Sequence, residues 1–120
     1  MRELKFRGWI NALKKMDYGT QNSITFDGKV YFGNAEITDF HQEIMQYIGL
    51  KDKNGREIYE GDIVEIRSGL FRMQGHVKYD NAGFQVLDSL DGFSEGFWYY
   101  PEDIEILGNI YENPELLNVT

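Results

Sequence analysis

The chain has 120 residues, a length that fits one domain or one small barrel with an appended arm. Its 12 Lys and Arg residues oppose 20 Asp and Glu residues, so the formal charge is −8 and overall basicity cannot carry binding to nucleic acid. The absence of cysteine excludes disulfides, thiolate nucleophiles and cysteine-based metal sites, and a hydrophobic content of 42% argues against a disordered chain.

The N-terminal part of the chain predicts β-hairpins. Residues 4–9 alternate between apolar and basic or aromatic side chains, which is typical of a strand, and Lys14 begins a return strand. Further on, two strand-like runs flank Asp27 and Gly28, a dipeptide that favours a two-residue type I′ turn because it tolerates positive φ. Two successive hairpins are therefore expected before residue 35.

Residues 35–48 are compatible with two structures. Thr38 or Asp39 is suited to cap a short helix, whereas the stretch from Ile44 to Ile48 resembles a strand. We favour the strand, which leaves the N-terminal region with hairpins and little helix.

From residue 62 onward the pattern favours a small antiparallel β-barrel of SH3-like character, built from five short strands with Gly-containing turns. Strands are expected at 62–67, 71–79, 84–87 and 104–110, with an aromatic run at 97–100 after a loop at Gly92 and Gly96. A single helical turn is expected at Pro114. The predicted organisation is one mainly β domain over 1–120, divided into an N-terminal hairpin subregion (1–47) and a barrel-like subregion (48–120).

The charges are unevenly distributed along the chain. Residues 1–20 carry a net charge of +3, whereas residues 79–120 contain nine acids and no Lys or Arg. Such a dipolar arrangement favours head-to-tail contacts between copies of the chain.

An aromatic run lies within this acidic C-terminal third. Aromatic side chains with a polar rim have the composition of a protein interface, although strand alternation would bury half of the run in the core. The candidate interaction residues are Phe97, Trp98, Tyr99 and Tyr100, together with Arg7 and Trp9 from the basic N-terminal segment.

Three motifs resemble those of the YopX family of phage and prophage proteins. They are IGLKDKNGREIYEGDIV at 48–64, KFRGW at 5–9 followed by Lys15 and Met16, and the closing segment ILGNIYENPELL at 106–117. The motifs occur in the expected order over nearly the whole chain, with Gly8 where the family would have Ala. This resemblance implies a largely β fold and expression inside an infected or lysogenic bacterium, and it brings no catalytic residues and no cofactor.

The longest of these motifs has a structural interpretation. Asn54 and Gly55 predict a turn, and Gly61 predicts a bend at the entry of a strand. Asp62 can accept backbone N–H bonds before a predicted buried core of Ile63, Val64 and Ile66. The alternative is an anion-binding loop formed by Lys51, Lys53 and Arg56, whose field the neighbouring acids would largely cancel.

The sequence gives little support to catalysis or metal binding. Ser68, His76 and Asp80 can be combined into a triad, but residues four apart on a strand lie roughly 13 Å from each other. His41 with Glu43, or His76 with a distant carboxylate, would supply only two metal ligands, and residues 88–92 match only a fragment of a calcium loop. No enzyme activity, cofactor or metal site is predicted.

We therefore expect a non-enzymatic protein-interaction module that self-associates or binds a host protein in the bacterial cytoplasm. No apolar run is long enough for a signal peptide or a membrane span. One alternative is that the acidic surface mimics nucleic acid and binds in the DNA site of a host DNA-binding protein. Another is a weak single-strand binder that stacks bases on the aromatic run, with Arg67, Arg72 and Lys78 nearby, although the surrounding acids make binding to nucleic acid unfavourable.

Overall fold

The computed structural model divides the chain into two compact units. We call Lys5–Gln46 the small unit and Met1–Leu4 with Tyr47–Thr120 the large unit. The structure describes residues 4–19, 22–41, 43–80, 83–88, 94–96 and 100–117. Antiparallel strands make up most of these residues, and the helical segments among them are short 3₁₀ turns, so the predicted mainly β fold with little helix is confirmed.

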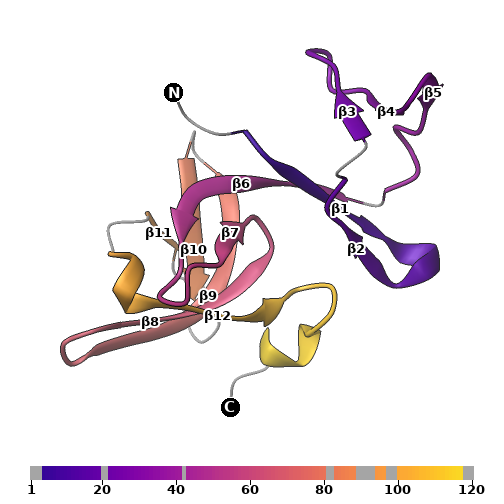
Figure 1. Ribbon diagram of the computed structural model, residues 1–120. Helices are drawn as coiled ribbons and strands as arrows, with labels where there is room; N and C mark the ends of the chain where they lie inside the picture. Colours follow the sequence, from indigo (N-terminus) through magenta and orange to yellow (C-terminus); the bar gives the residue numbers. More distant parts are fainter. Residues whose placement is uncertain are drawn as a thin grey trace. The chain divides into compact units, whose positions relative to one another are not determined.

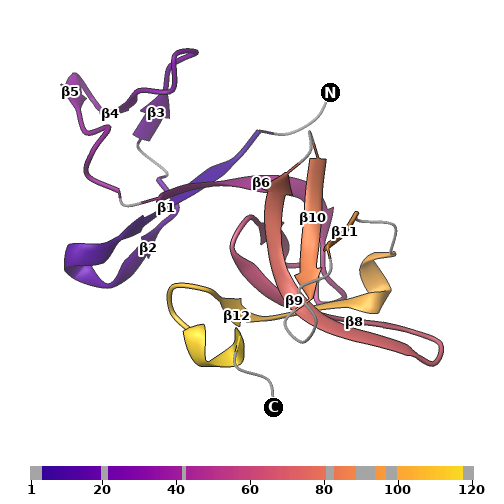
Figure 2. The same cartoon turned by 180° about the vertical axis from the view of Figure 1, so that it is seen from behind.

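A five-stranded antiparallel sheet forms most of the large unit. Its strands are β8 (Asp62–Ser68), β9 (Phe71–Asp80), β10 (Gly83–Asp88), β11 (Ser94–Gly96) and β12 (Ile104–Asn109). Their order across the sheet is β11-β10-β9-β8-β12, and the sheet curls into a half-barrel (Figure 1). The last of these five strands in the sequence, β12, therefore lies beside β8 rather than beside β11 (Figure 2).

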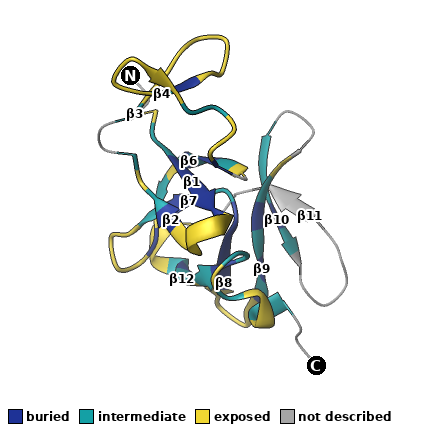
Figure 3. Ribbon diagram, turned by 90° about the vertical axis from the view of Figure 1, so that its right-hand side faces the viewer, coloured by how far each residue is buried: buried dark blue, intermediate teal, exposed yellow. Residues whose placement is uncertain are grey.

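The core of the large unit follows from alternation along these strands. Its fully buried side chains include Ile58, Val64, Ile66, Val77, Val86 and Ile104. Each contributes roughly 1.5–3 kcal/mol by leaving water. Buried residues are seen along β7 (Glu57–Tyr59) and β8 (Figure 3), and the predicted burial of Ile63, Val64 and Ile66 is confirmed.

One long strand, β6 (Glu43–Lys51), runs from the small unit into the large unit. Its second half pairs with β7, and the rings of the paired residues Tyr47 and Tyr59 lie 5.8 Å apart between centroids. The strand that we favoured for Ile44 to Ile48 is thus confirmed, and the predicted turn at Asn54 and Gly55 joins β6 to β7.

The C-terminal segment is held to the sheet by side-chain hydrogen bonds. A 3₁₀ turn, η2 (Pro101–Asp103), precedes β12, and a second one, η3 (Pro114–Leu117), confirms the helical turn expected at Pro114. On β9, the Gln74 Nε2 donates to the carbonyl oxygen of Leu116 at 2.8 Å. The Asn109 Oδ1 accepts the backbone N–H groups of Tyr111 and Glu112 in the intervening turn.

The small unit contains two sets of strands. In the first, β1 (Phe6–Ile10) pairs on one side with β2 (Lys15–Asp17) and on the other with the first half of β6. A 3₁₀ turn, η1 (Asn11–Leu13), joins β1 to β2. The second set is a three-stranded sheet of β3 (Asn22–Ile24), β4 (Val30–Phe32) and β5 (Ala35–Glu36).

Two local predictions are wrong. The β3–β4 connection is wider than a two-residue type I′ turn, because Ile24 pairs with Val30 and the Thr25 N–H donates to the Lys29 carbonyl at 2.9 Å. The Asp27 carboxylate stabilises this wider turn by accepting bonds from the Thr25 hydroxyl and the Lys29 N–H. In addition, Gly96 was expected in a loop, but it lies in β11 and pairs with β10.

Candidate functional site

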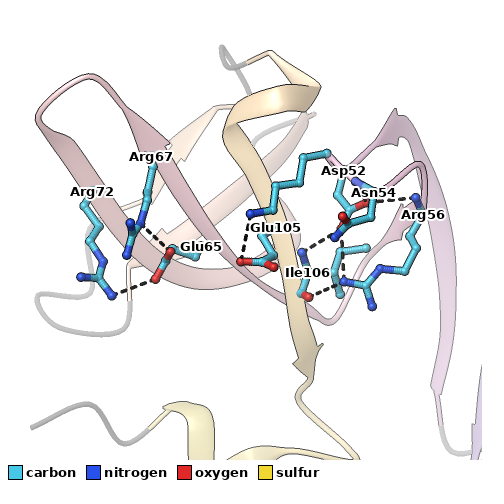
Figure 4. A network of polar contacts seen from close by, with 9 residues as sticks. Asp52, Asn54, Arg56, Glu65, Arg67, Arg72, Glu105 and Ile106 are labelled. Carbon is cyan, nitrogen blue, oxygen red and sulfur yellow. Dashed lines mark hydrogen bonds and ion pairs between the residues drawn. The ribbon is translucent and has the colours of Figure 1, made fainter.

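The buried carboxylate of Asp52 lies where the turn between β6 and β7 meets β12. Its side chain has an exposed fraction of 0%. One oxygen, Oδ1, accepts the backbone N–H groups of Asn54 at 2.9 Å and Arg56 at 3.0 Å (Figure 4). The other oxygen, Oδ2, accepts the N–H of Ile106 on β12 at 3.0 Å. A single side chain thereby shapes the turn and ties it to a strand 54 residues further along.

The guanidinium of Arg56 strengthens the same junction. Its Nη2 lies 3.3 Å from the Asp52 Oδ2 and donates to the Ile106 carbonyl at 2.6 Å. The backbone adds a further bond from the Lys53 N–H to the Ile104 carbonyl at 2.8 Å. We call this set of contacts between 52–56 and β12 the Asp52 clamp.

The protonation of Asp52 follows from its surroundings. Burial raises the pKa of this carboxyl, but the hydrogen bonds from Ile106, Arg56 and Asn54, together with the charge of Arg56, outweigh burial and hold the pKa below its ordinary value. Asp52 is therefore an anion at neutral pH, and its donors are all supplied by the protein itself, as in a structural carboxylate.

A second buried carboxylate, Asp62, organises the entry into β8. Its Oδ2 accepts the N–H of Tyr59 at 2.8 Å, as the sequence predicts. The bend at Gly61, with φ of 87°, is also confirmed. Bonds from the Gly61 N–H to Val77 and from the Ile110 N–H to Gly61 then connect this bend to two other segments. The longest motif of the sequence thus acts through turns and backbone bonds.

A row of ion pairs crosses the sheet face next to the clamp. The Glu65 carboxylate binds the Arg67 Nε at 2.7 Å and the Arg72 Nη2 at 2.9 Å. Its cross-strand partner Glu105 lies 3.5 Å from the Lys53 Nζ (Figure 4). Burial raises the pKa of Glu65, but the two guanidinium groups outweigh it and lower the pKa below its ordinary value.

This arrangement bears on the alternative of an anion-binding loop. Arg56 is paired with Asp52, and Lys53 is paired with Glu105. Lys51 lies opposite Glu57 in the β6–β7 pairing. Each of the three cations therefore has an acid beside it, which reduces the field that would attract an anion.

The predicted interaction residues differ in their placement. Tyr100 is 70% exposed, whereas Arg7 and Trp9 are each only 4% exposed and present almost no surface. Both lie on β1, a strand that is paired on both sides, and as alternate residues their side chains project from the same face of it. Phe97, Trp98 and Tyr99 lie outside the described residues.

The residues of the hypothetical triad are not brought together. In the β8–β9 ladder, Ser68 pairs with Phe71 and His76 pairs with Ile63. These pairs are five positions apart, which corresponds to roughly 17 Å along the strands. The Asp80 side chain and residues 89–92 lie outside the description.

The other histidine has a partner that the sequence did not suggest. In the small unit, the Nε2 of the buried His41 lies 2.8 Å from the Asp17 Oδ2. This hydrogen bond is the main reason why the pKa of Asp17 lies below its ordinary value. The two residues are 24 positions apart, so no local pattern could have revealed the pair. Within the described ranges, no three His, Asp or Glu side chains form a group suited to a metal ion.

The chain resembles known proteins over almost its full length. It matches the family described as YopX protein over residues 5–118. The crystal structure of protein EF1440 from Enterococcus faecalis has 26% identity and a TM-score of 0.64, covering 98% of this chain and 100% of that chain. The structure of protein yopX from Bacillus subtilis has 26% identity and a TM-score of 0.65, covering 97% and 98%.

Two further findings concern curated proteins and membrane helices. A search of curated proteins gave no significant match. Among the described residues, no helix has the length and apolar character required to cross a membrane. The motif order and the family match agree, and the chain belongs to the YopX protein family.

Proposed function

We propose that this protein is a non-enzymatic interaction module that self-associates, encoded by a phage or prophage and active in the bacterial cytoplasm. The observation that carries the proposal is the presence of large apolar side chains at exposed turns. Phe26 and Leu70 are fully exposed at the ends of hairpins, and Tyr100 is largely exposed beside η2. Contact surfaces between proteins are built around apolar side chains that are exposed in the separate chain.

The buried polar groups support a structural rather than a catalytic role. Asp52 and Asp62 both accept backbone N–H bonds that hold turns and strands together. A general acid or base needs a carboxyl with free access to a substrate proton. The surroundings of Asp52 leave it neither exposed nor short of donors.

The charge distribution favours contact between copies. The turn at the end of the β1–β2 hairpin exposes Lys14 and Lys15. The C-terminal segment exposes Glu102, Glu112 and Glu115, and no Lys or Arg occurs after residue 78. Exposed charges of opposite sign on separate segments attract each other between molecules, and added salt screens that attraction.

Light scattering coupled to size exclusion tests self-association. We expect a mass above that of one chain at low ionic strength, with a decrease toward the monomer when salt shortens the Debye length from about 10 Å to about 3 Å. A monomeric mass over the full range of protein and salt concentrations would contradict the proposal.

The acidic C-terminal segment also favours a second candidate, a mimic of nucleic acid that binds a host DNA-binding protein. Affinity capture from a bacterial lysate distinguishes this candidate. It predicts recovery of a DNA-binding protein that duplex DNA displaces, whereas recovery without any such protein argues against it.

A further inference from the structure

The β8–β9 hairpin carries an apolar tip. The hairpin extends away from the rest of the five-stranded sheet, as two opposite views show (Figures 1 and 2). At its end, Leu70 is fully exposed and Phe71 is 44% exposed. The exposure of a leucine side chain to water is unfavourable in free energy, and a contact that covers the side chain removes this cost.

Two arginines lie next to this tip and are held by the same carboxylate. Arg67 and Arg72 face each other across the hairpin and share Glu65, so the three charges sum to +1. The two arginine side chains remain 62% and 64% exposed, and each uses one nitrogen on Glu65. Because a guanidinium has five N–H donors, both arginines retain donors for a second carboxylate.

Acidic and aromatic groups lie beside the same hairpin. The 3₁₀ turn η2 packs against β8, and the residue that follows it, Ile104, pairs with Ile66 of β8. The turn presents Tyr100, Glu102 and Asp103, and neither of its two carboxylates forms an ion pair with another residue in the part of the chain that the structure describes. The hairpin with its cationic and apolar groups and the turn with its anionic and aromatic groups are therefore neighbouring segments of the large unit.

We define the tip patch as the residues Arg67, Leu70, Arg72, Tyr100, Glu102 and Asp103 of these two segments. We propose that the tip patch binds the tip patch of a second copy of the chain across a two-fold axis. The arginines of one copy then meet Glu102 and Asp103 of the other, and Leu70 meets Tyr100. This inference rests on the proposed self-association and specifies the surface that produces it.

The order of charges favours a second copy over other partners. A polyanion such as nucleic acid would be attracted by the arginines but repelled by Glu102 and Asp103, and a polycation would meet the reverse problem. The patch needs a partner that carries both signs in the opposite order. A two-fold axis supplies such a partner, because each group then faces its complement on the other copy.

Three variants test the contact by sedimentation over a range of protein concentrations. Leu70→Ser removes the apolar anchor. A positive-to-negative variant carries Arg67→Glu and Arg72→Glu, and a negative-to-positive variant carries Glu102→Lys and Asp103→Lys. We expect each variant alone to dimerise at least about tenfold more weakly than the unmodified chain, because loss of one buried anchor or reversal of several charges is worth 1.4 kcal/mol or more.

Mixing the two charge variants gives the sharpest result. In the mixed dimer, the introduced glutamates face the introduced lysines, and the original arginines face the original acids. Both contacts are then attractive, so the two variants are expected to bind each other more tightly than either variant binds itself. A merely misfolded variant could not regain binding in this way.

Matched controls separate this surface from others. Leu13→Ser removes an exposed leucine from η1, at the end of the other hairpin, and is expected to leave the dimer unchanged. Circular dichroism checks the fold of all variants, since the introduced glutamates stand beside Glu65. Leu70→Ser alters no charge and keeps the test valid if those glutamates disturb the hairpin.

The outcomes distinguish this inference from the proposed function. If the unmodified chain associates but Leu70→Ser and both charge variants associate within twofold of it, the tip patch is wrong and self-association stands. If Leu13→Ser weakens association and Leu70→Ser does not, the interface lies elsewhere. If the unmodified chain is monomeric throughout, both the inference and the proposed self-association fail.

Discussion

Asp52 shows how one buried residue can connect distant parts of a small β protein. Its two oxygens accept the N–H groups of Asn54 and Arg56 within the turn and that of Ile106 in β12. Hydrogen bonds to a charged group contribute about 1.5–3 kcal/mol each, so the carboxylate stabilises the fold through the three bonds that it accepts. A neutral side chain of the same shape does not replace it.

The variant Asp52→Asn is expected to lower the free energy of unfolding by about 2–4 kcal/mol. The amide oxygen can still accept hydrogen bonds from the turn. The amide NH2 group replaces the other oxygen, so it faces the donors of Ile106 and Arg56 without being able to accept from them. Urea denaturation measures the loss. Asp39→Asn, which removes an exposed carboxylate, is the matched control and is expected to change stability by less than about 0.5 kcal/mol.

The same pair of proteins reveals the pH dependence of the clamp. Because the folded pKa of Asp52 lies below its ordinary value of 3.8, the unfolded chain binds more protons between the two pKa values, and stability falls as the pH drops through that window. The difference between the unmodified chain and Asp52→Asn is therefore expected to be full above about pH 5 and to shrink as the pH falls through about 4. A difference that stays constant across this range would contradict the assignment.

Gly8 illustrates a residue whose small size is needed by a distant neighbour. A Cβ added at Gly8 would overlap the imidazole of His41 and lie 2.7 Å from its Cγ. The family resemblance leads one to expect Ala at this position. The close approach of His41 to β1 gives a physical reason for glycine here.

A double-mutant cycle tests this coupling. We expect Gly8→Ala to destabilise the chain by about 1–3 kcal/mol through overpacking, but to cost less than about 0.5 kcal/mol when His41→Ala has already opened the space. Urea denaturation of the four proteins gives the coupling energy. Additive losses would show that the imidazole does not restrict Gly8.

At the level of the strand, β9 holds a histidine, His76, that is only partly exposed. His76 is half-buried between Ile63 of β8 and Leu87 of β10. Burial lowers the pKa of His76 below its ordinary value, and the charge of Lys78 lowers it further. The folded chain therefore resists protonation of this histidine more than the unfolded chain does.

This difference has a predictable sign. Below an unfolded pKa of about 6.5 the unfolded state takes up the proton first, so stability declines as the pH falls from about 7.5 toward the folded pKa. His76→Gln is expected to decline less over this range, as measured by urea midpoints at several pH values. His41 is present in both proteins, so the difference between them isolates His76, and identical slopes would contradict the prediction.

The strands themselves could largely be predicted, because each depends on its own residues. Alternation located β8, β9, β10 and β12 to within one or two residues. The width of the β3–β4 turn could not be predicted in this way, because the Asp27 carboxylate stabilises a wider turn than the dipeptide alone favours. The strand β11 was missed because it forms by pairing with β10, including at Gly96, and this contact lies outside its own segment.

For the whole molecule, burial is distributed unequally between elements. The strands β8 and β9 have seven and ten residues and carry most of the fully buried core. The sheet of β3, β4 and β5 has strands of three, three and two residues, and among them only Val30 is buried. Short strands with little buried apolar area open at low free energy.

Native-state hydrogen exchange is expected to follow this inequality. Amides of Val64, Ile66 and Val77 should exchange slowest, near the rate set by global unfolding, whereas amides of β3–β5 should exchange orders of magnitude faster. Hydrogen exchange measured residue by residue with NMR provides the test. Similar protection in both sheets would show that the chain opens only as a whole.

The sequence by itself determined the features that depend on neighbours along the chain. Antiparallel strands, the Asn54–Gly55 turn, the bond accepted by Asp62 and the acidic C-terminal third were all readable, since turns and alternation are local. Tertiary structure alone decided which distant groups meet. The bond from Ile106 to Asp52, the His41–Asp17 pair, the burial of Arg7 and the approach of η2 to β8 depend on which distant segments become neighbours, and alternation within a segment does not specify this.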